Sequence, residues 1–359
     1  MQIGIVGLPY SGKSTIFSTL TNNKSDDFAS KNKTEKGMVK VPDSRLDALA
    51  EIFQPNKKTE TNIEYIKVPG LEAEAAASGS LPAQFIGNLK NVDAMLLMIR
   101  KFENEIYPHP FGETNPENDI EFVNAEFLLS DLSILETRIE KLGKSIMKMN
   151  KPEDKKEMEV LTKCKNHLEE EKPLRLLHLY PEEEKLIRGF QFLSLKPIVY
   201  VINIAEDDIP NTSDIIKQYE SVLTEKTGLT ALCAEIEKEI SEMDVEDQEM
   251  FMEEMGIKEP ALNNVIRKSY DLLGLISFLT VGEDECRCWT VKTGAKSPEA
   301  GGQIHSDIER GFIRATVVTF EEFMKHKSLK ACKDVGVLRV EGKEYIVQDG
   351  DIMEFRFNV

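Results

Sequence analysis

A nine-residue stretch near the start of the chain, "GLPYSGKST" (7–15), constrains the fold more than any other feature. It matches the phosphate-binding pattern G-x-x-x-x-G-K-[ST] and stands between an apolar segment, "QIGIVG", and a helical one, "KSTIFSTLTN". The two fixed glycines let backbone N–H groups close on phosphate oxygens, and the following helix adds the positive end of its dipole. The pattern therefore predicts a strand–loop–helix unit that binds the phosphates of a nucleotide.

The chemistry of this loop predicts a role for each of its residues. Lys13 reaches the terminal phosphates and is a predicted catalytic side chain, while the Ser14 hydroxyl is a predicted ligand of Mg²⁺. The other predicted nucleotide contacts in the loop are Gly7, Pro9, Tyr10, Ser11, Gly12 and Thr15.

Strand-like and helix-like segments alternate through residues 1–118 and again through 196–274. The strands are continuously apolar, as in "AMLLMIR" (94–100) and "IVYVI" (198–202). Such an alternation indicates a mostly parallel sheet with helices on both faces. We therefore predict an α/β fold, a P-loop domain formed by these two ranges, with a helix over 212–228 and a last strand over 229–234.

Residues 119–195 interrupt this alternation with a different pattern. Apolar residues recur at spacings of four and three along one long helix, at Leu128, Leu132, Leu135, Ile139, Leu142, Ile146 and Met149. "NKPED" (150–154) breaks the helix, and Met158, Leu161 and Leu168 share one face of the next. The pattern predicts an inserted antiparallel coiled-coil hairpin; pairing of two chains through the same seam is the alternative.

From about residue 275 the chain becomes rich in strand patterns. "VLRVEGKEYIVQDGDIMEFRFNV" contains turn signals at Glu-Gly-Lys and Asp-Gly-Asp, and Met353, Phe355 and Phe357 fall on one strand face. We expect residues 275–359 to form a separate small α+β domain.

A second candidate site element is "NIAE", which follows the 198–202 strand. A guanine-specific NTPase has N-K-x-D there, but this chain has Ile204 in place of the lysine and Glu206, one methylene longer, in place of the aspartate. The change favours adenine or a relaxed choice of base, with Asn203 and Glu206 facing it at the carboxyl end of a parallel strand. The backbone of Cys233, Ala234 and Glu235 would contact the base from the next strand.

Composition limits the partners and the compartment. A net charge of −18 disfavours backbone-driven nucleic-acid binding, although residues 275–359 carry 12 basic and 14 acidic side chains and could hold a local basic face. We expect no sequence-specific DNA as a partner. We also expect no membrane as a partner, because the apolar runs are only long enough for strands. Five scattered cysteines suit a reducing compartment, so we expect the cytoplasm; Cys286 and Cys288 lack zinc-site spacing.

The chain resembles the Obg-like ATPase family, YchF type, over nearly its full length. The resemblance is carried by the phosphate loop, by "VPDSRLDALAEIFQP" (41–55), by "KPIVYVIN" and by the long C-terminal stretches "LISFLTVGEDECRCWTVKTGAKSPEAGGQIHSDIERGFIRA" and "LRVEGKEYIVQDGDIMEFRFNV". It implies a P-loop G domain, a helical domain and a C-terminal TGS domain of β-grasp type. It also implies ATP favoured over GTP through the NxxE motif, and association with the ribosome or its RNA or proteins.

The chain departs from this family where the strand over 62–68 ends. The family keeps Asp at the position of Lys67, and a Gly-rich loop where this chain has Glu74, Ser78, Ser80 and Pro82. An ammonium about 5 Å from Mg²⁺ would repel the ion by roughly 6–7 kcal/mol at an effective dielectric of about 20. We expect Lys67 to turn away or to form an ion pair elsewhere. The alternatives are that its charge partly replaces Mg²⁺ at the phosphates, or that it reaches solvent.

Three further switch positions are predicted. Gly70 is retained, so its N–H can meet a γ-phosphate, and it is the second predicted catalytic position. Leu71 takes the place of the water-positioning Gln of most GTPases, as the resemblance implies. The second Mg²⁺-ligating hydroxyl should come from Ser30 or Thr34, and the sequence does not decide between them.

These features give three hypotheses of function. The leading one is an NTPase that binds ATP, possibly also GTP, with Mg²⁺, hydrolyses it slowly and regulates a step at the ribosome. The second is a non-hydrolysing, nucleotide-dependent regulator whose second switch is degraded at Lys67. The third, a scaffold that ignores nucleotide, leaves "GLPYSGKST" without a purpose.

Overall fold

The computed structural model describes residues 1–22, 34–68, 81–149 and 151–358. These residues form two compact units. The first unit contains residues 1–38 and 64–272, and the second contains residues 39–63 and 273–359. In the described part of the chain, no helix combines the length and the apolar character needed to cross a membrane.

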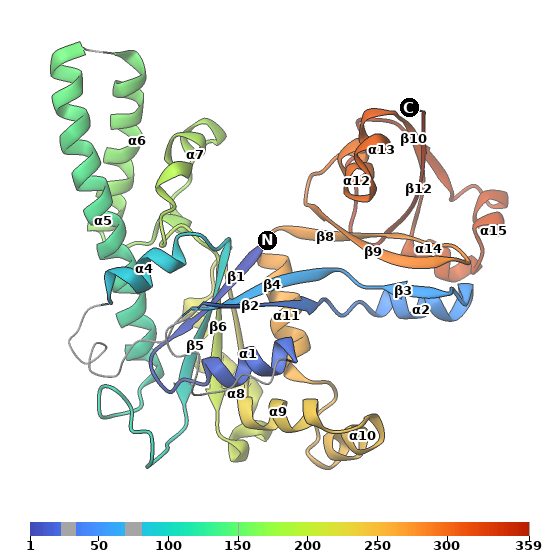
Figure 1. Cartoon of the computed structure of the whole chain (residues 1–359), viewed down its shortest axis with the longest axis horizontal. Helices are drawn as coiled ribbons and strands as arrows, with labels where there is room; N and C mark the ends of the chain where they lie inside the picture. Colours follow the sequence, from blue (N-terminus) through green and yellow to red (C-terminus); the bar gives the residue numbers. More distant parts are fainter. Residues whose placement is uncertain (23–33, 69–80, 150, 359) are drawn as a thin grey trace. The chain divides into compact units, whose positions relative to one another are not determined.

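The first unit is built on a six-stranded sheet (Figure 1). In spatial order its strands are β2 (Glu35–Lys40), β4 (Asn62–Lys67), β1 (Gln2–Gly7), β5 (Ala94–Lys101), β6 (Ile198–Ile204) and β7 (Thr227–Leu232). β1 pairs in parallel with β4 and β5, and the pairs β5–β6 and β6–β7 are also parallel. Parallel strands need crossover connections, and helices provide them.

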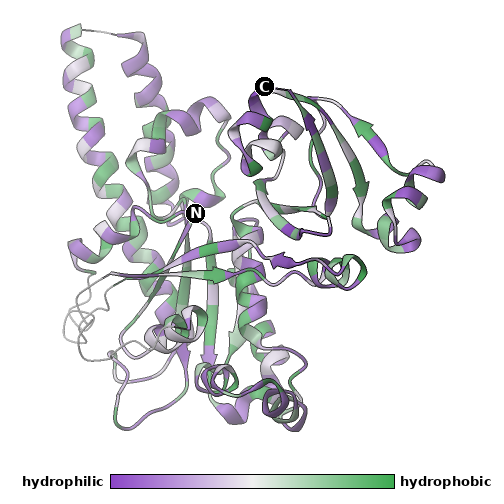
Figure 2. Cartoon of the chain, turned by 45° about the vertical axis from the view of Figure 1, so that its right-hand side comes forward, coloured by the Kyte–Doolittle hydropathy of each residue, from purple (hydrophilic) through white to green (hydrophobic). Residues whose placement is uncertain are grey.

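Helices cover both faces of this sheet. One face, with Met95, Leu97 and Tyr200, packs against α4 (Ala83–Leu89), α5 (Pro116–Met149) and α8 (Thr212–Gln218). The other face carries α1 (Lys13–Thr21) on β1 and α11 (Ala261–Leu272) on β6 and β7. Figure 2 shows the hydrophobic residues gathered on these central strands, which is the burial that holds such a sheet between its helices. The predicted α/β fold class is confirmed.

The remaining helices of this unit are short or belong to the hairpin. They are α6 (Pro152–Glu169), η1 (Leu174–Leu176), α7 (Pro181–Ile187), η2 (Arg188–Phe190), η3 (Glu206–Asn211), η4 (Glu220–Val222), α9 (Ala234–Glu242) and α10 (Val245–Glu254).

The inserted helices form a hairpin within one chain, as Figure 1 shows for α5 and α6. Leu135 and Leu142 of α5 are buried against Leu161, Cys164 and Leu168 of α6. The rest of the predicted seam is partly buried in the same core, except Met149, which is exposed. The apolar heptad positions of α5 therefore pack against α6 of the same chain, as the predicted hairpin requires.

The second unit has its own six-stranded sheet. In spatial order the strands are β11 (Arg339–Glu341), β10 (Phe312–Thr319), β12 (Asp351–Phe357), β8 (Leu275–Thr280), β9 (Glu285–Lys292) and β3 (Lys57–Thr59). Its helices are α2 (Ser44–Phe53), α12 (Ser297–Ile304), α13 (Ser306–Arg310), α14 (Phe320–His326) and α15 (Leu329–Asp334). Met353 and Phe355 pack into its core as their alternation predicts, whereas Phe357 at the end of β12 is 45% exposed.

Residues 39–63 belong to a different unit from the one that the predicted domain boundaries give them. The range 1–118 includes residues 39–63, but the structure places them with the C-terminal residues. Leu46 and Leu49 of α2 are buried in the C-terminal core, and Arg45 donates to Asp349 at 2.7 Å. Strand β3 also pairs in parallel with β9. The segment between β2 and β4 therefore completes the C-terminal unit.

A smaller difference concerns the helix predicted over 212–228. It ends as α8 at Gln218, and Thr227 already belongs to β7. The Thr227 hydroxyl donates to the Val222 carbonyl at 2.8 Å and accepts from the Thr224 N–H at 2.6 Å. These bonds close a turn that ends the helical segment before the strand.

Candidate nucleotide-binding site

The phosphate loop leaves the carboxyl end of β1 in a conformation that its glycines permit. Gly12 has φ +94°, and a Cβ there would meet the Asn203 side-chain amide. Gly7 lies against the Met98 carbonyl, where a Cβ would also clash. Both positions are thus restricted to glycine by close approach, and Gly12 also by its left-handed backbone.

The loop ends in an uncapped helix. Gly12 is the N-cap of α1, and no side chain caps the helix there. The first N–H groups of α1 are therefore available to an anion, and the helix dipole favours one. Ser11 is buried next to this position, and its hydroxyl has no hydrogen-bond partner among the described residues. Such an arrangement is typical of a site that binds phosphate.

Lys13 is the cation of this loop. Its side chain is buried, and Nζ donates to the Leu8 carbonyl at 2.5 Å, so the ammonium lies folded over the loop. Burial, together with the charge of Lys67, lowers the pKa of Lys13 to about 7. An anion bound beside a buried lysine stabilises its charged form and raises its pKa again. Lys13 is therefore suited to bind a phosphate.

Asn203 joins the phosphate loop to the next strand end. Its Nδ2 donates to the Ser11 carbonyl at 3.1 Å, and its Oδ1 accepts from the Ala234 N–H at 3.0 Å. The side chain is 3% exposed, so the structure brings the loop, the end of β6 and the start of α9 together. The predicted grouping of Asn203, Ala234 and the phosphate loop is present, but here Asn203 binds the protein itself.

The other residues predicted at the base lie around this junction. Cys233 is buried at the N-cap of α9, and Glu235 is exposed in its first turn. Glu206 is exposed at the start of η3, and its charge, after burial of the thiol, is among the causes that raise the pKa of Cys233. Glu206 therefore lies near the 233–235 loop and is accessible to a ligand.

Three residues of the loop complete its description. Pro9 is buried, Ser14 is exposed in the first turn of α1, and Thr15 is half-buried with its carbonyl bonded to Ser18 and Thr19 hydroxyls. Tyr10 is 47% exposed at φ +60° and stacks on Tyr107, with ring centroids 5.1 Å apart.

The position of Lys67 answers the question that the sequence leaves open. Nζ of Lys67 lies 2.6 Å from Glu35 Oε1 and 5.8 Å from the centre of the Phe17 ring. The residue is 8% exposed, so the interpretation as a solvent-reaching lysine is wrong. The expected ion pair is confirmed, and its partner is the first residue of β2.

The described residues fit Mg²⁺ in one place and not in another. The Ser14 hydroxyl has the donor type and the exposure that a magnesium ligand needs. The end of β4, by contrast, presents an ammonium. In the ranges that the structure describes, no group of three or more His, Cys, Asp or Glu is placed to hold a metal. Within the described phosphate loop, Ser14 is therefore the residue that would hold a magnesium ion beside the phosphates of the nucleotide.

The switch predictions fall mostly outside the described residues. Ser30, Gly70 and Leu71 lie there. Thr34 is described, is exposed and immediately precedes β2. The choice between Ser30 and Thr34 stays open.

Sequence reasoning missed several groups beside the site. Arg100 at the end of β5 is 1% exposed and donates to the Phe102 and Tyr107 carbonyls at 2.9 and 2.7 Å, which holds the loop of Tyr107. His109 and Asp119 form a buried pair, with Nε2 3.1 Å from Oδ2. Arg100 could have been noticed in the sequence, because it is a charged residue at the end of an apolar strand. No sequence pattern indicates that His109 and Asp119 form a pair.

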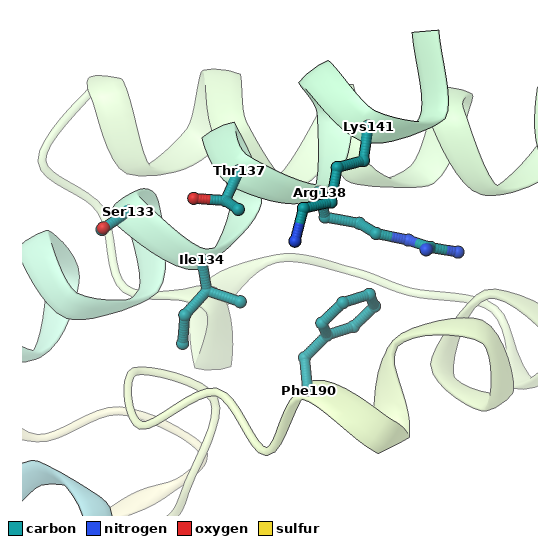
Figure 3. A pocket seen from close by; sticks show the side chains of 6 residues that line it. All are labelled: Ser133, Ile134, Thr137, Arg138, Lys141 and Phe190. Atoms are coloured by element: carbon teal, nitrogen blue, oxygen red, sulfur yellow. The ribbon is translucent and has the colours of Figure 1, made fainter. Parts of the chain in front are cut away.

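A hollow of about 350 Å³ lies elsewhere, between α5 and η2 (Figure 3). Its lining residues are Ser133, Ile134, Thr137, Arg138, Lys141 and Phe190. Arg138 is already paired with Glu157 by two hydrogen bonds of 2.7 and 2.8 Å. The lining contains no carboxylate or thiol, so it offers no counterpart to the chemistry of the phosphate loop.

Comparisons with known proteins agree with this geometry. A family model described as "50S ribosome-binding GTPase" matches residues 2–163. A model of the YchF GTPase C-terminal domain, described as a protein of unknown function, matches residues 275–358.

Full-length relatives extend the similarity to the whole chain. The chain is 40% identical over 368 residues to the "Ribosome-binding ATPase YchF" of Bacillus subtilis (strain 168), covering 100% of both. It is 41% identical over 361 residues to the protein of that name from Escherichia coli O157:H7, covering 100% of this chain and 99% of the relative. The solved structure of the Schizosaccharomyces pombe YchF GTPase matches with a TM-score of 0.87 at 27% identity, over 99% of this chain and 97% of that one. The chain therefore belongs to the YchF family of P-loop NTPases.

Proposed function

We propose that this chain binds ATP at the phosphate loop, hydrolyses it slowly and uses the nucleotide to control an association with the ribosome. The observation that carries the proposal is the phosphate loop itself, an uncapped helix start with a buried lysine folded over it. Backbone N–H groups of residues 7–15 would hold the phosphates, and Lys13 would polarise the terminal one. The relatives named ribosome-binding ATPases support the substrate and the partner.

Magnesium is part of this proposal. Ser14 would hold the ion, with Thr34 or Ser30 as a second hydroxyl. When bound, the ion would neutralise phosphate charge and orient the terminal phosphate. Gly70 would donate its N–H to that phosphate, and because Leu71 has no polar group, another residue or a partner must position the attacking water.

The base preference rests on the junction at Asn203. Asn203 fixes the loop at Ala234, and Glu206 lies exposed near that loop, so Glu206 would be the side chain there that a base can reach. A carboxylate one methylene longer than the usual aspartate disturbs guanine recognition, which favours ATP over GTP. The five cysteines, all described as free and buried thiols, support a reducing compartment such as the cytoplasm.

A non-hydrolysing regulator is the second candidate. The cation at the end of β4 favours it, because a carboxylate at this place normally anchors magnesium-bound water. The intact phosphate loop is compatible with both.

Hydrolysis of ATP by the purified chain decides between them. We expect slow, Mg²⁺-dependent release of phosphate that Lys13→Ala reduces by about 100-fold or more, since the variant lacks the charge that polarises the terminal phosphate. Release no greater than that of the variant, with ATP still bound, would favour the regulator. Competition between ATP and GTP measures the base preference, and tighter GTP would contradict the role given to Glu206.

A further inference from the structure

The ion pair between Lys67 and Glu35 lies beside the phosphate loop. Lys67 is the last residue of β4, and its backbone is in register with Ile5, two residues before Gly7. Its side chain faces α1, since Nζ lies over the Phe17 ring. The ammonium is thus on the same side of the sheet as Lys13, which occupies the first position of that helix.

Two lysines share this place. In the part of the chain that the structure describes, Lys13 and Lys67 lie here with the carboxylate of Glu35, and all three side chains are largely buried. After burial, the charge of Lys67 is the second cause that lowers the pKa of Lys13. An anion that binds between two largely buried lysines would offset their mutual repulsion and stabilise their charged forms.

The side chains allow an exchange of partners. A lysine has a flexible four-carbon stem and three donors, so Nζ can change direction without moving the strand. The Glu35 side chain is 22% exposed and the Lys67 side chain 10% exposed, so water can reach the carboxylate once the ammonium leaves.

We propose that Lys67 leaves Glu35 for the terminal phosphates when a nucleoside triphosphate binds, and that its ammonium there supplies positive charge that a metal ion supplies in related sites. Glu35 is the counterion of this ammonium before the nucleotide binds. The inference rests on the proposed nucleotide binding. It implies that ATP binding depends only weakly on Mg²⁺, whatever hydrolysis requires.

Two variants of one ion pair test it, with ATP titrated calorimetrically into the full chain in excess Mg²⁺ or in EDTA. Chelation should cost the unmodified chain less than about tenfold in affinity. Lys67→Met should weaken metal-free binding by about tenfold or more, because a positive charge is lost from the site. Glu35→Gln should strengthen it severalfold, because the competing carboxylate is gone.

A matched control lies between the same two strands. Lys36 of β2 pairs with Glu64 of β4 at 3.7 Å, and its side chain is 51% exposed. Lys36→Met should leave both affinities within about twofold, as expected for an exposed pair.

The opposite directions of the two effects separate this role from a structural one. If the pair only stabilised the fold, Lys67→Met and Glu35→Gln would weaken binding together, and that result overturns the inference. Equal chelation losses in Lys67→Met and the unmodified chain also overturn it, while the proposed function stands because ATP still binds. If Lys67→Met does not fold, Glu35→Gln alone decides through the sign of its effect. Absence of ATP binding in both conditions removes the proposed function and the inference with it.

Discussion

Two regions of the first unit bury cations, and the protein partners them differently. At the base of the hairpin, Arg175 donates to Asn124 Oδ1 at 2.9 Å, to the Tyr200 hydroxyl at 3.3 Å and to the Ser194 carbonyl at 3.4 Å. The buried carboxylate of Asp131 lies nearby and accepts two backbone N–H groups. In this region, which we call the hairpin base, the chain itself supplies the acceptors that a buried cation needs.

The phosphate edge, formed by Lys13, Glu35 and Lys67, is different. Lys13 has the Leu8 carbonyl and Lys67 has Glu35, but the two ammonium groups still repel one another. Burying a charge is costly unless its partners compensate the lost hydration. A cation whose partners come from the chain therefore serves stability, and a cation left short of partners serves a ligand.

Removing the hairpin-base cation should give the largest loss of stability. Arg175→Met removes the guanidinium hydrogen bonds to Asn124 Oδ1, the Tyr200 hydroxyl and the Ser194 carbonyl. It also removes one of the positive charges that act on Asp131. We expect the free energy of unfolding to fall by about 2–4 kcal/mol. Urea unfolding followed by circular dichroism measures it. Arg188→Met, at an exposed position close by in sequence, should change it by less than about 0.5 kcal/mol. Equal small effects would remove the distinction between the two regions.

Removing the phosphate-edge cation should have the opposite sign. Lys13→Met keeps most of the side-chain volume and removes a buried charge that Lys67 repels. It takes the lysine hydrogen bond from one acceptor, the Leu8 carbonyl. Replacement of buried charges by apolar groups of similar size is often stabilising. We expect the nucleotide-free protein to gain about 1–3 kcal/mol in the same urea experiment while ATP binding is lost. A loss of stability would mean that Lys13 is already satisfied without a ligand.

The contrast also explains how much of the site the sequence predicts. The phosphate loop is a local pattern, so Gly12, Lys13 and the start of α1 follow from consecutive residues. Asn203 could be placed at a strand end from the apolar run before it, but its bonds to Ser11 and Ala234 depend on how strands far apart in sequence align. The Lys67–Glu35 pair is of the same kind, because no local pattern pairs positions 35 and 67.

The fold shows the same limit. Apolar strands predict the parallel sheet of the first unit, since their pattern and their order are both visible in the sequence. The segment 39–63 has a helix pattern with buried Leu46 and Leu49, which does not say which core buries them. Contacts between residues far apart in sequence, such as the pairing of β3 with β9 and the bond of Arg45 to Asp349, place it in the C-terminal unit.

The smallest expected effect is the pH dependence of the phosphate edge. The pKa of Lys13 is lowered to about 7 in the folded, nucleotide-free protein from the ordinary value of 10.5, chiefly by burial. Between these values the unfolded chain binds more protons than the folded one, so the free energy of unfolding should rise with pH. In Lys13→Met this contribution is absent, so its advantage over the unmodified chain should shrink by about 1 kcal/mol for each pH unit between pH 7 and pH 9. Urea unfolding of both proteins at several pH values gives the difference, in which the other titrating groups cancel. A difference that stays constant over this window would show that the folded chain keeps Lys13 charged, and that the phosphate edge is as well partnered as the hairpin base.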